Sequence, residues 1–205
     1  MDTTTALLIA DLVGVAVFAA SGGSAGVGKG LDVFGVVFLG CVAALGGGVL
    51  RDVFIGDFPP LAFADWRYSG TAAAASLLVF FLHPQLARIR RTVLVLDAAG
   101  LGLFVAAGTL KALDFGVPVV GAVILGMITG IGGGLLRDLL TAEIPLVLRR
   151  EIYAVAALLG AVVVVVGHHR GLPNLAVLLV PAMLTFVVRM IAVQRDWSAP
   201  VARQL

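Results

Sequence analysis

The chain has 205 residues, of which 60% are apolar and only 13% are charged, and its mean hydropathy is +1.11. These values exclude an ordinary soluble protein. The formal net charge is only +2, and the few charges fall in loops or recur inside apolar segments, so the composition does not indicate a nucleic-acid partner. The sequence predicts a polytopic membrane protein in contact with membrane lipid.

Seven segments predict transmembrane helices, because a helix needs about 20 apolar residues to cross a bilayer. They lie near residues 6–26, 32–56, 68–83, 92–110, 118–140, 152–167 and 173–193. The segments that connect them are short and leave no room for a soluble domain. The predicted fold class is therefore an all-α membrane protein with seven transmembrane helices.

Part of the first half of the chain returns 86 positions later. Residues 46–52 read GGGVLRD and residues 132–138 read GGGLLRD, and 18 of the 49 positions in 11–59 are identical to their counterparts in 97–145. So regular a duplication indicates two related halves. Each half holds three predicted helices, and because three is odd, the second half must enter the membrane upside down.

This duplication divides the chain into three predicted parts. Residues 1–88 form the first three-helix repeat, residues 89–170 the second and inverted repeat, and residues 171–205 a seventh helix with a cytoplasmic tail. The two repeats are expected to be related by a pseudo-two-fold axis in the plane of the membrane.

Positive charge predicts the orientation. One face of the membrane receives nine basic residues: Lys29, Arg88, Arg90, Arg91, Arg149, Arg150, Arg189, Arg195 and Arg203. The opposite face receives three: Arg67, Lys111 and Arg170. Lys and Arg concentrate on the cytoplasmic side, so the N-terminus is predicted outside and the C-terminus in the cytoplasm. The excess of Arg over Lys indicates a GC-rich prokaryotic genome and hence a plasma or inner membrane.

Two glycine triplets fall late in the second and fifth predicted helices. They comprise Gly46, Gly47 and Gly48 in the first half and Gly132, Gly133 and Gly134 in the second. Each glycine gives up about 1 kcal/mol of helix propensity, and irregular backbone in a membrane is tolerated where it lines a cavity or is buried in protein. We expect both helices to be broken or bent there and to line a pathway. The alternative is that the triplets serve close packing between helices.

Charges at repeated positions inside the predicted helices indicate an ion pathway. Two clusters are expected: Asp11 with Arg51 and Asp52 near the outer mouth, and Asp97 with Arg137 and Asp138 near the inner mouth. Ionisable groups in a membrane usually face a cavity or a partner, and two acids with one base favour a cation. The alternative is that each cluster is a salt-bridged clamp, and the two roles can coexist.

The remaining polar and aromatic residues indicate no further chemistry. The histidines show no metal-ligand spacing, no cofactor is predicted, and no nucleophile–base pair indicates an enzyme. Three aromatic residues are expected at the membrane interface: Trp66, Tyr68 and Trp197.

Two inverted three-helix repeats, each with a glycine triplet before Leu-Arg-Asp, plus a seventh helix, resemble the prokaryotic branch of the trimeric intracellular cation channel family. The resemblance covers residues 5–193. It implies a homotrimer in which every protomer has its own pore, lined by the glycine-broken second and fifth helices and passing monovalent cations, chiefly potassium. The lysine-containing motif with which animal members bind phosphoinositide has no match here. Bacterial sequences of this type have also been labelled as possible glycine transporters.

The predicted function is therefore a passive potassium-permeable channel, with the glycine bends at the constriction and the acidic clusters biasing its electrostatics. The alternative is a secondary transporter of a small solute such as glycine, in which the ends of broken helices bind carboxylate and ammonium. The sequence alone does not separate these two functions.

Overall fold

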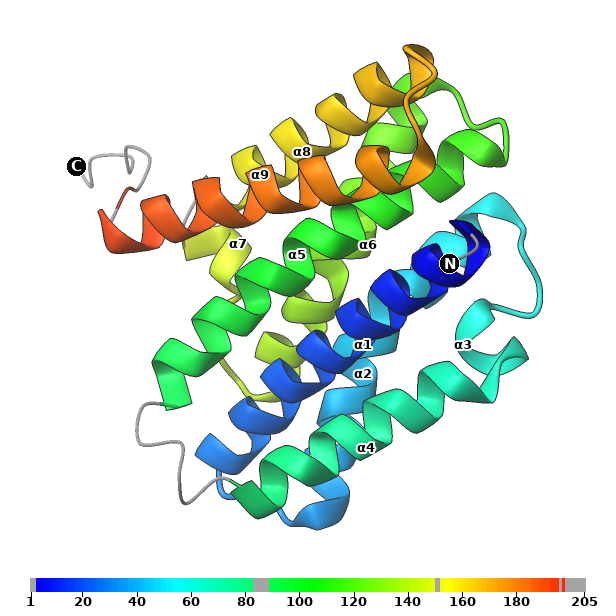
Figure 1. The fold of residues 1–205 in the computed structure, drawn as a ribbon. Helices are drawn as coiled ribbons and strands as arrows, with labels where there is room; N and C mark the ends of the chain where they lie inside the picture. The colour runs from blue at the N-terminus through cyan, green and yellow to red at the C-terminus, as the bar shows by residue number, and fades with distance from the viewer. Residues whose placement is uncertain (1–2, 83–88, 150–151, 196, 198–205) are drawn as a thin grey trace.

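The computed structural model describes residues 3–82, 89–149, 152–195 and 197, and every regular element in them is an α-helix. In chain order these helices are α1 (Thr3–Gly28), α2 (Val33–Ile55), α3 (Leu61–Ala64), α4 (Trp66–Leu82), α5 (Ile89–Asp114), α6 (Val119–Leu140), α7 (Leu146–Arg149), α8 (Ile152–His169) and α9 (Asn174–Gln194). The long helices form a single bundle (Figure 1).

All seven predicted membrane segments fall on helices of this bundle. Six of them, α1, α2, α5, α6, α8 and α9, are long and apolar enough to cross a membrane. The remaining one, α4, has 17 residues, at the short end of the roughly 17–25 that span a bilayer. The chain is thus a multi-pass, all-helical membrane protein, and a seventh crossing by α4 stays a prediction.

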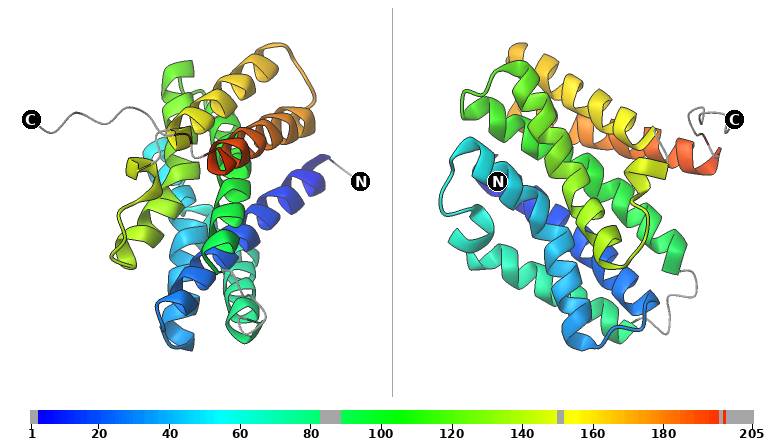
Figure 2. Two further views of the ribbon diagram at one scale, coloured as in Figure 1. Left: turned by 90° about the vertical axis from the view of Figure 1, so that its left-hand side faces the viewer. Right: turned by 180° about the vertical axis from the view of Figure 1, so that it is seen from behind.

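Helix α5 occupies the centre of the bundle. It packs against α1, α6, α8 and α9, and the views in Figures 1 and 2 show it running between the group of α1, α2 and α4 and the pair of α8 and α9. Helix α9 packs on α5 and α8. Any charged residue that points inward from α5 is therefore surrounded by both halves of the chain.

Helices α2 and α6 cross at the central glycines of the two triplets. A methyl group on Gly47 would collide with the backbone carbonyl of Thr129, and one on Gly133 would collide with that of Ala43. The two helices therefore touch backbone to backbone and run in opposite directions. Adding 86 to Gly47 and subtracting 86 from Thr129 gives Gly133 and Ala43, so the duplication exchanges one contact with the other.

Helices α1 and α5 show the same reciprocal relation. A methyl group on Gly14 would come within 2.7 Å of the Phe104 ring, and one on Gly100 within 2.6 Å of the Phe18 ring. The two rings pack in a tilted arrangement, with their centroids 5.3 Å apart. These residues too exchange on a shift of 86, so both central helix pairs cross through contacts that the duplication repeats.

Both glycine triplets lie inside uninterrupted helices, so a break of either helix at its triplet is wrong, while a bend there stays a prediction. Helix α2 continues past its triplet to Ile55, and α6 continues past its triplet to Leu140. Small residues allow helix backbones to approach closely in a membrane, and the packing of α2 on α6 compensates the low helix propensity of glycine. The packing interpretation of the triplets is the one that the helix contacts bear out.

Local sequence explains how α2 ends and how the chain continues. The Asp32 side chain caps the start of α2 by accepting a hydrogen bond of 2.7 Å from the Gly35 amide. Gly56 closes the helix in a left-handed conformation with φ of 75°, which glycine adopts without strain. The turn of α3 follows Pro60, just as α7 follows Pro145. Neither of these four-residue helices was predicted.

We expect Gly47→Ala and Gly133→Ala to destabilise the protein, because each added methyl collides with a backbone carbonyl of the facing helix. Overpacking costs up to about 3 kcal/mol, more than the roughly 1 kcal/mol that alanine gains over glycine in a helix. Thermal unfolding of the detergent-purified protein measures the loss.

Gly48→Ala is the matched control for this comparison. A methyl group there meets only the Arg51 guanidinium, at 3.9 Å, so the unfolding temperature should stay the same or rise. An equal loss of stability at all three glycines would show that the collisions at the α2–α6 crossing are not what the triplets avoid.

Candidate functional site

The first group of buried charges lies where α1, α2, α4 and α5 meet. We call Asp11, Arg51, Asp52, Tyr68 and Lys111 the Arg51 cluster. Within it, Arg51 Nε donates to Asp52 Oδ1 at 2.9 Å and Lys111 Nζ to the same oxygen at 2.8 Å. Lys111 also forms an ion pair of 2.6 Å with Asp57, which follows α2. The prediction that Arg51 lies beside Asp11 or Asp52 is therefore confirmed, with Asp52 as its partner.

The Asp52 carboxylate has three partners. Besides its two cations it accepts a hydrogen bond of 3.0 Å at Oδ2 from the Leu61 amide, the first residue of α3. Only 1% of the Asp52 side chain is exposed, and a buried carboxylate is stable when its charge is both paired and hydrogen-bonded. The turn of α3 thus completes the cluster.

Asp11 joins the Arg51 cluster through a tyrosine. The Tyr68 hydroxyl donates to Asp11 Oδ2 at 2.7 Å, while Arg51 makes its ion pair with Asp52. Tyr68 is buried, with 7% exposure, so the prediction that it lies at the membrane interface is wrong, whereas Trp66 is 81% exposed. The sequence separates the two poorly, because both stand at the start of the same apolar helix.

The second group of charges lies where α1, α5, α6 and α8 meet. We call Ser21, Asp97, Arg137, Asp138 and Tyr153 the Arg137 cluster. Arg137 Nη1 donates to Asp97 Oδ1 at 2.7 Å and to Ser21 Oγ at 2.6 Å, and its Nε donates to Asp138 Oδ1 at 2.8 Å. Only 1% of Arg137 is exposed. The prediction that Arg137 lies beside Asp97 or Asp138 is confirmed, and Arg137 pairs with both.

Helix α9 adds a second cation behind the Arg137 cluster. Arg189 is 1% exposed, and its guanidinium carbon lies 4.7 Å from the centroid of the Tyr153 ring. Arg189 is among the charges predicted at the cytoplasmic face, and the structure places it inside the bundle, five residues before α9 ends at Gln194. A cation over an aromatic face is attracted to the ring quadrupole.

The two clusters share one plan. Each contains an Arg and an Asp that are neighbours in the sequence, and a backbone amide from the short helix that follows a proline. Each also contains a tyrosine that lies beside the Asp of the first helix in that half of the chain. In the second half the Leu146 amide donates to Asp138 Oδ2 at 2.9 Å, and the buried Tyr153 interacts with Asp97. Neither tyrosine and neither amide is predicted from the sequence as part of a cluster, although the matched prolines at 59 and 145 were a signal for the turns.

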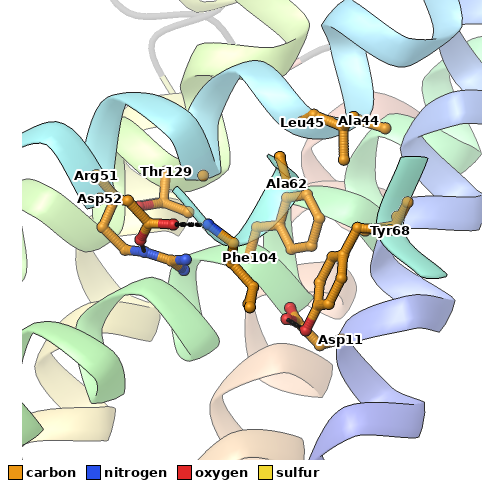
Figure 3. A pocket seen from close by; sticks show the side chains of 12 residues that line it. Asp11, Ala44, Leu45, Arg51, Asp52, Ala62, Tyr68, Phe104 and Thr129 are labelled. Carbon is orange, nitrogen blue, oxygen red and sulfur yellow. Dashed lines mark hydrogen bonds and ion pairs between the residues drawn. The ribbon is translucent and has the colours of Figure 1, made fainter. Parts of the chain in front are cut away.

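The clusters differ in the space beside them. A cavity of about 340 Å³ opens next to the Arg51 cluster and reaches the end of α5 at Asp114 and Phe115. A smaller pocket of about 30 Å³ adjoins it, because Asp11, Arg51 and Tyr68 line both. In Figure 3, Arg51 and Asp52 lie on one side of this pocket and Asp11 and Tyr68 on the other. The hollow beside the Arg137 cluster has no room for water, about 0 Å³.

The glycine triplets connect these two regions. Gly48 lines the pocket of the Arg51 cluster, and Gly134 lines the closed hollow of the Arg137 cluster. Between them, Gly47 and Gly133 form the crossing of α2 and α6. The other two glycines face apolar or small neighbours: Gly46 faces Leu136, and Gly132 faces Gly47.

The described residues contain no group of three His, Cys, Asp or Glu side chains that could hold a metal ion. The buried carboxylates are instead used by the cations and amides given above. The arrangement is therefore suited to holding charges inside a membrane next to a water-accessible cavity.

Together, the fold and the two clusters define a multi-pass helical membrane protein with ion pairs buried at the centre of the bundle. Residues 8–84 and 94–169 match the family described as glycine transporter, which is three quarters of the chain, so the chain belongs to that family. The match falls on both halves of the duplicated sequence.

Relatives and solved structures agree with this assignment. The chain is 46% identical to a UPF0126 membrane protein of Deinococcus radiodurans over 74% of this chain and 71% of the relative. It is 38% identical to the UPF0126 inner membrane protein YadS of Escherichia coli over 93% of each. A TRIC trimeric intracellular cation channel orthologue from Rhodobacter sphaeroides has a TM-score of 0.90 at 34% identity, covering 94% of this chain and 100% of that chain. The resemblance to trimeric intracellular cation channels is thereby confirmed.

We expect Arg137→Ala to reduce stability more than Arg51→Ala. Loss of Arg137 leaves Asp97 and Asp138 buried without their shared cation, whereas Asp52 keeps Lys111 after loss of Arg51. Breaking a buried ion pair costs about 3–5 kcal/mol. Thermal unfolding in detergent measures the difference, and adding Asp97→Asn to Arg137→Ala should restore part of the stability.

Arg67→Ala provides the control for removal of an arginine. Its ion pair with Asp65 lies at the surface, with 48% of the Arg67 side chain exposed, and such pairs contribute about 0–1 kcal/mol. If Arg51→Ala and Arg137→Ala were as mild as Arg67→Ala, neither cluster would be a stabilising clamp.

Proposed function

We propose that this chain is a cation channel of a prokaryotic cell membrane, with a pathway through each protomer between α2 and α6. The observation that carries the proposal is a water-accessible cavity that ends on the acid-rich Arg51 cluster. Support comes from the fold, which is similar to that of proteins described as TRIC cation channels. Assembly as a homotrimer is part of the same proposal.

The proposed pathway follows the cavities and the glycine triplets in sequence. A cation enters the cavity at Asp114 and Phe115, passes the Arg51 cluster, and reaches the small pocket at Gly48. Beyond it stand the glycine crossing and then the closed Arg137 cluster. Conduction requires the crossing and the Arg137 cluster to open, so the structure corresponds to a closed state in this proposal.

Charge along this route favours cations. The Arg51 cluster with Asp57 holds three carboxylates and two cations, a formal charge of −1 if all are ionised. A pore mouth with excess acid concentrates cations and repels anions. Potassium is the proposed principal ion because it is the abundant monovalent cation of the cytoplasm. In this proposal the excess of acid selects cations over anions, and the width of the opened α2–α6 crossing limits the size of the cation that passes.

We further propose that the two halves, residues 1–88 and 89–170, are inverted repeats with α9 added by residues 171–205. The reciprocal glycine contacts support this proposal, because a two-fold axis exchanges each contact with its partner. The positive charges on the loops support an external N-terminus and a cytoplasmic C-terminus. Without the buried Arg189, the predicted cytoplasmic face still has more Lys and Arg residues than the opposite face.

The family is described as glycine transporter, so transport of glycine is the competing function. A transporter must expose one site alternately to the two sides. Flux from liposomes that contain the purified protein separates the two. A channel gives steady flux of potassium and sodium but little of chloride or glycine. Saturable uptake of labelled glycine that shows counterflow, without ion flux, would refute the channel.

We expect Gly48→Leu to reduce potassium flux to the level of protein-free liposomes, because the side chain would fill the small pocket that Gly48 lines. Gly48→Ala should retain flux, since its methyl meets no close neighbour. Size-exclusion profiles and unfolding temperatures establish that both variants assemble. Undiminished flux through a well-assembled Gly48→Leu protein would place the pathway elsewhere.

Phe58 and Ile144 test the inverted orientation. They are equivalent positions on the shift of 86 and are 67% and 55% exposed. In a Cys41→Ser background, we expect Phe58→Cys to react with a membrane-impermeant maleimide on intact cells and Ile144→Cys to react only after permeabilisation. Labelling of both from the same side would contradict the inverted repeat.

A further inference from the structure

A cavity of about 300 Å³ lies between α8 and α9, away from both charge clusters. Its lining is apolar except for one residue: Val163, Val166, Gly167, Arg170, Leu172, Ala176, Val177, Val180 and Pro181. The two helices lie side by side and are joined at the Arg170 end (Figure 1). The cavity therefore runs inward from the end of α8, where a membrane helix meets the lipid headgroups.

The cavity is open to the outside of the bundle. Val166 and Val180, one on each helix, are 52% and 60% exposed. Gly167 and Ala176 have small side chains that leave the space between the helices unfilled. Pro181 lies inside α9. Since α8 and α9 cross the hydrocarbon region, the material that meets this opening in a membrane is lipid chain.

Arg170 stands at the headgroup end of the cavity. It is exposed, and its side chain makes no hydrogen bond or ion pair with the residues that the structure describes. The cavity lining contains no acidic residue. A single guanidinium above an apolar slot matches a phosphate group attached to a hydrocarbon chain, since guanidinium binds phosphate through paired hydrogen bonds.

The length of the cavity also matches a lipid chain. From Val163 to Arg170 is seven residues of α8, or about 10 Å along the helix. One leaflet of a bilayer has about 15 Å of hydrocarbon, half of the roughly 30 Å core. The upper part of an acyl chain therefore fits beside these residues when its phosphate lies at Arg170.

We propose that the groove between α8 and α9 binds one acyl chain of an anionic phospholipid whose phosphate is held by Arg170. The apolar walls supply affinity for the chain, and Arg170 supplies preference for a headgroup that carries net negative charge. The site is separate from the proposed ion pathway, so it stands whether or not the protein conducts ions.

Native mass spectrometry of the detergent-purified protein tests this site with defined lipids. The probes are phosphatidylglycerol and phosphatidylcholine with identical chains, because only the first has a net charge. We expect phosphatidylglycerol to bind preferentially and Arg170→Gln to reduce its binding about fivefold, the effect of one basic residue near an anionic lipid surface. Inorganic phosphate should not compete, since it has no chain for the groove.

Matched variants separate the groove from general effects. Ala176→Phe should reduce binding of both lipids by filling the groove, while Leu179→Phe, on the same helix but outside the lining, should not. Arg67→Gln removes a positive charge from the same predicted membrane face and should leave the lipid preference unchanged.

Three results would overturn the proposal. The first is equal binding of phosphatidylglycerol by the wild type and by Arg170→Gln, and the second is an equal loss with Arg67→Gln. The third is a change of oligomeric state in Ala176→Phe without any change in bound lipid, which would assign the groove to a contact between copies of the chain.

Discussion

The structure depends on the close approach of α2 to α6, which only glycine permits. Gly47 lies against the carbonyl of Thr129 and Gly133 against that of Ala43, with no space for a methyl group. In a bilayer, helices gain little by hiding apolar surface from one another, because lipid is equally apolar. Backbone contact of this kind supplies the packing instead. It also brings the Arg-Asp pairs, a few residues beyond each triplet, to opposite ends of one crossing.

The buried charges follow from that crossing. An Arg and an Asp next to one another in a helix can pair, but each cluster also needs an acid from the first helix of its half and an amide from the turn after a proline. The bundle supplies these partners only because α1, α5 and the two short helices surround the crossing. Each carboxylate would otherwise be costly at that depth. Each cluster thus ties several helices together, and the proposed ion pathway would pass the same carboxylates.

The two halves differ in what surrounds their charge clusters. Lys111 and Asp57 extend the Arg51 cluster toward a cavity of about 340 Å³, whereas Ser21 and Tyr153 seal the Arg137 cluster and Arg189 of α9 lies behind it. A perfectly symmetric molecule would be open or closed equally at both ends. Helix α9, which has no counterpart in the duplication, breaks this symmetry on the closed side.

The sequence by itself determined the all-helical membrane class, the seven apolar segments and the duplication. It also determined that Arg51 and Arg137 each lie beside an acid of their own half. These follow from hydropathy and from the cost of burying charge, which act on the chain wherever its helices are placed. The sequence did not determine that the glycine triplets lie in unbroken helices, because a glycine that weakens a helix and one that admits a neighbouring helix look alike. Nor did it place Tyr68, Tyr153, Lys111 and Arg189 beside the clusters. Those contacts join residues 36 to 59 positions apart, and only the packing of α4, α5, α8 and α9 around the clusters brought them together.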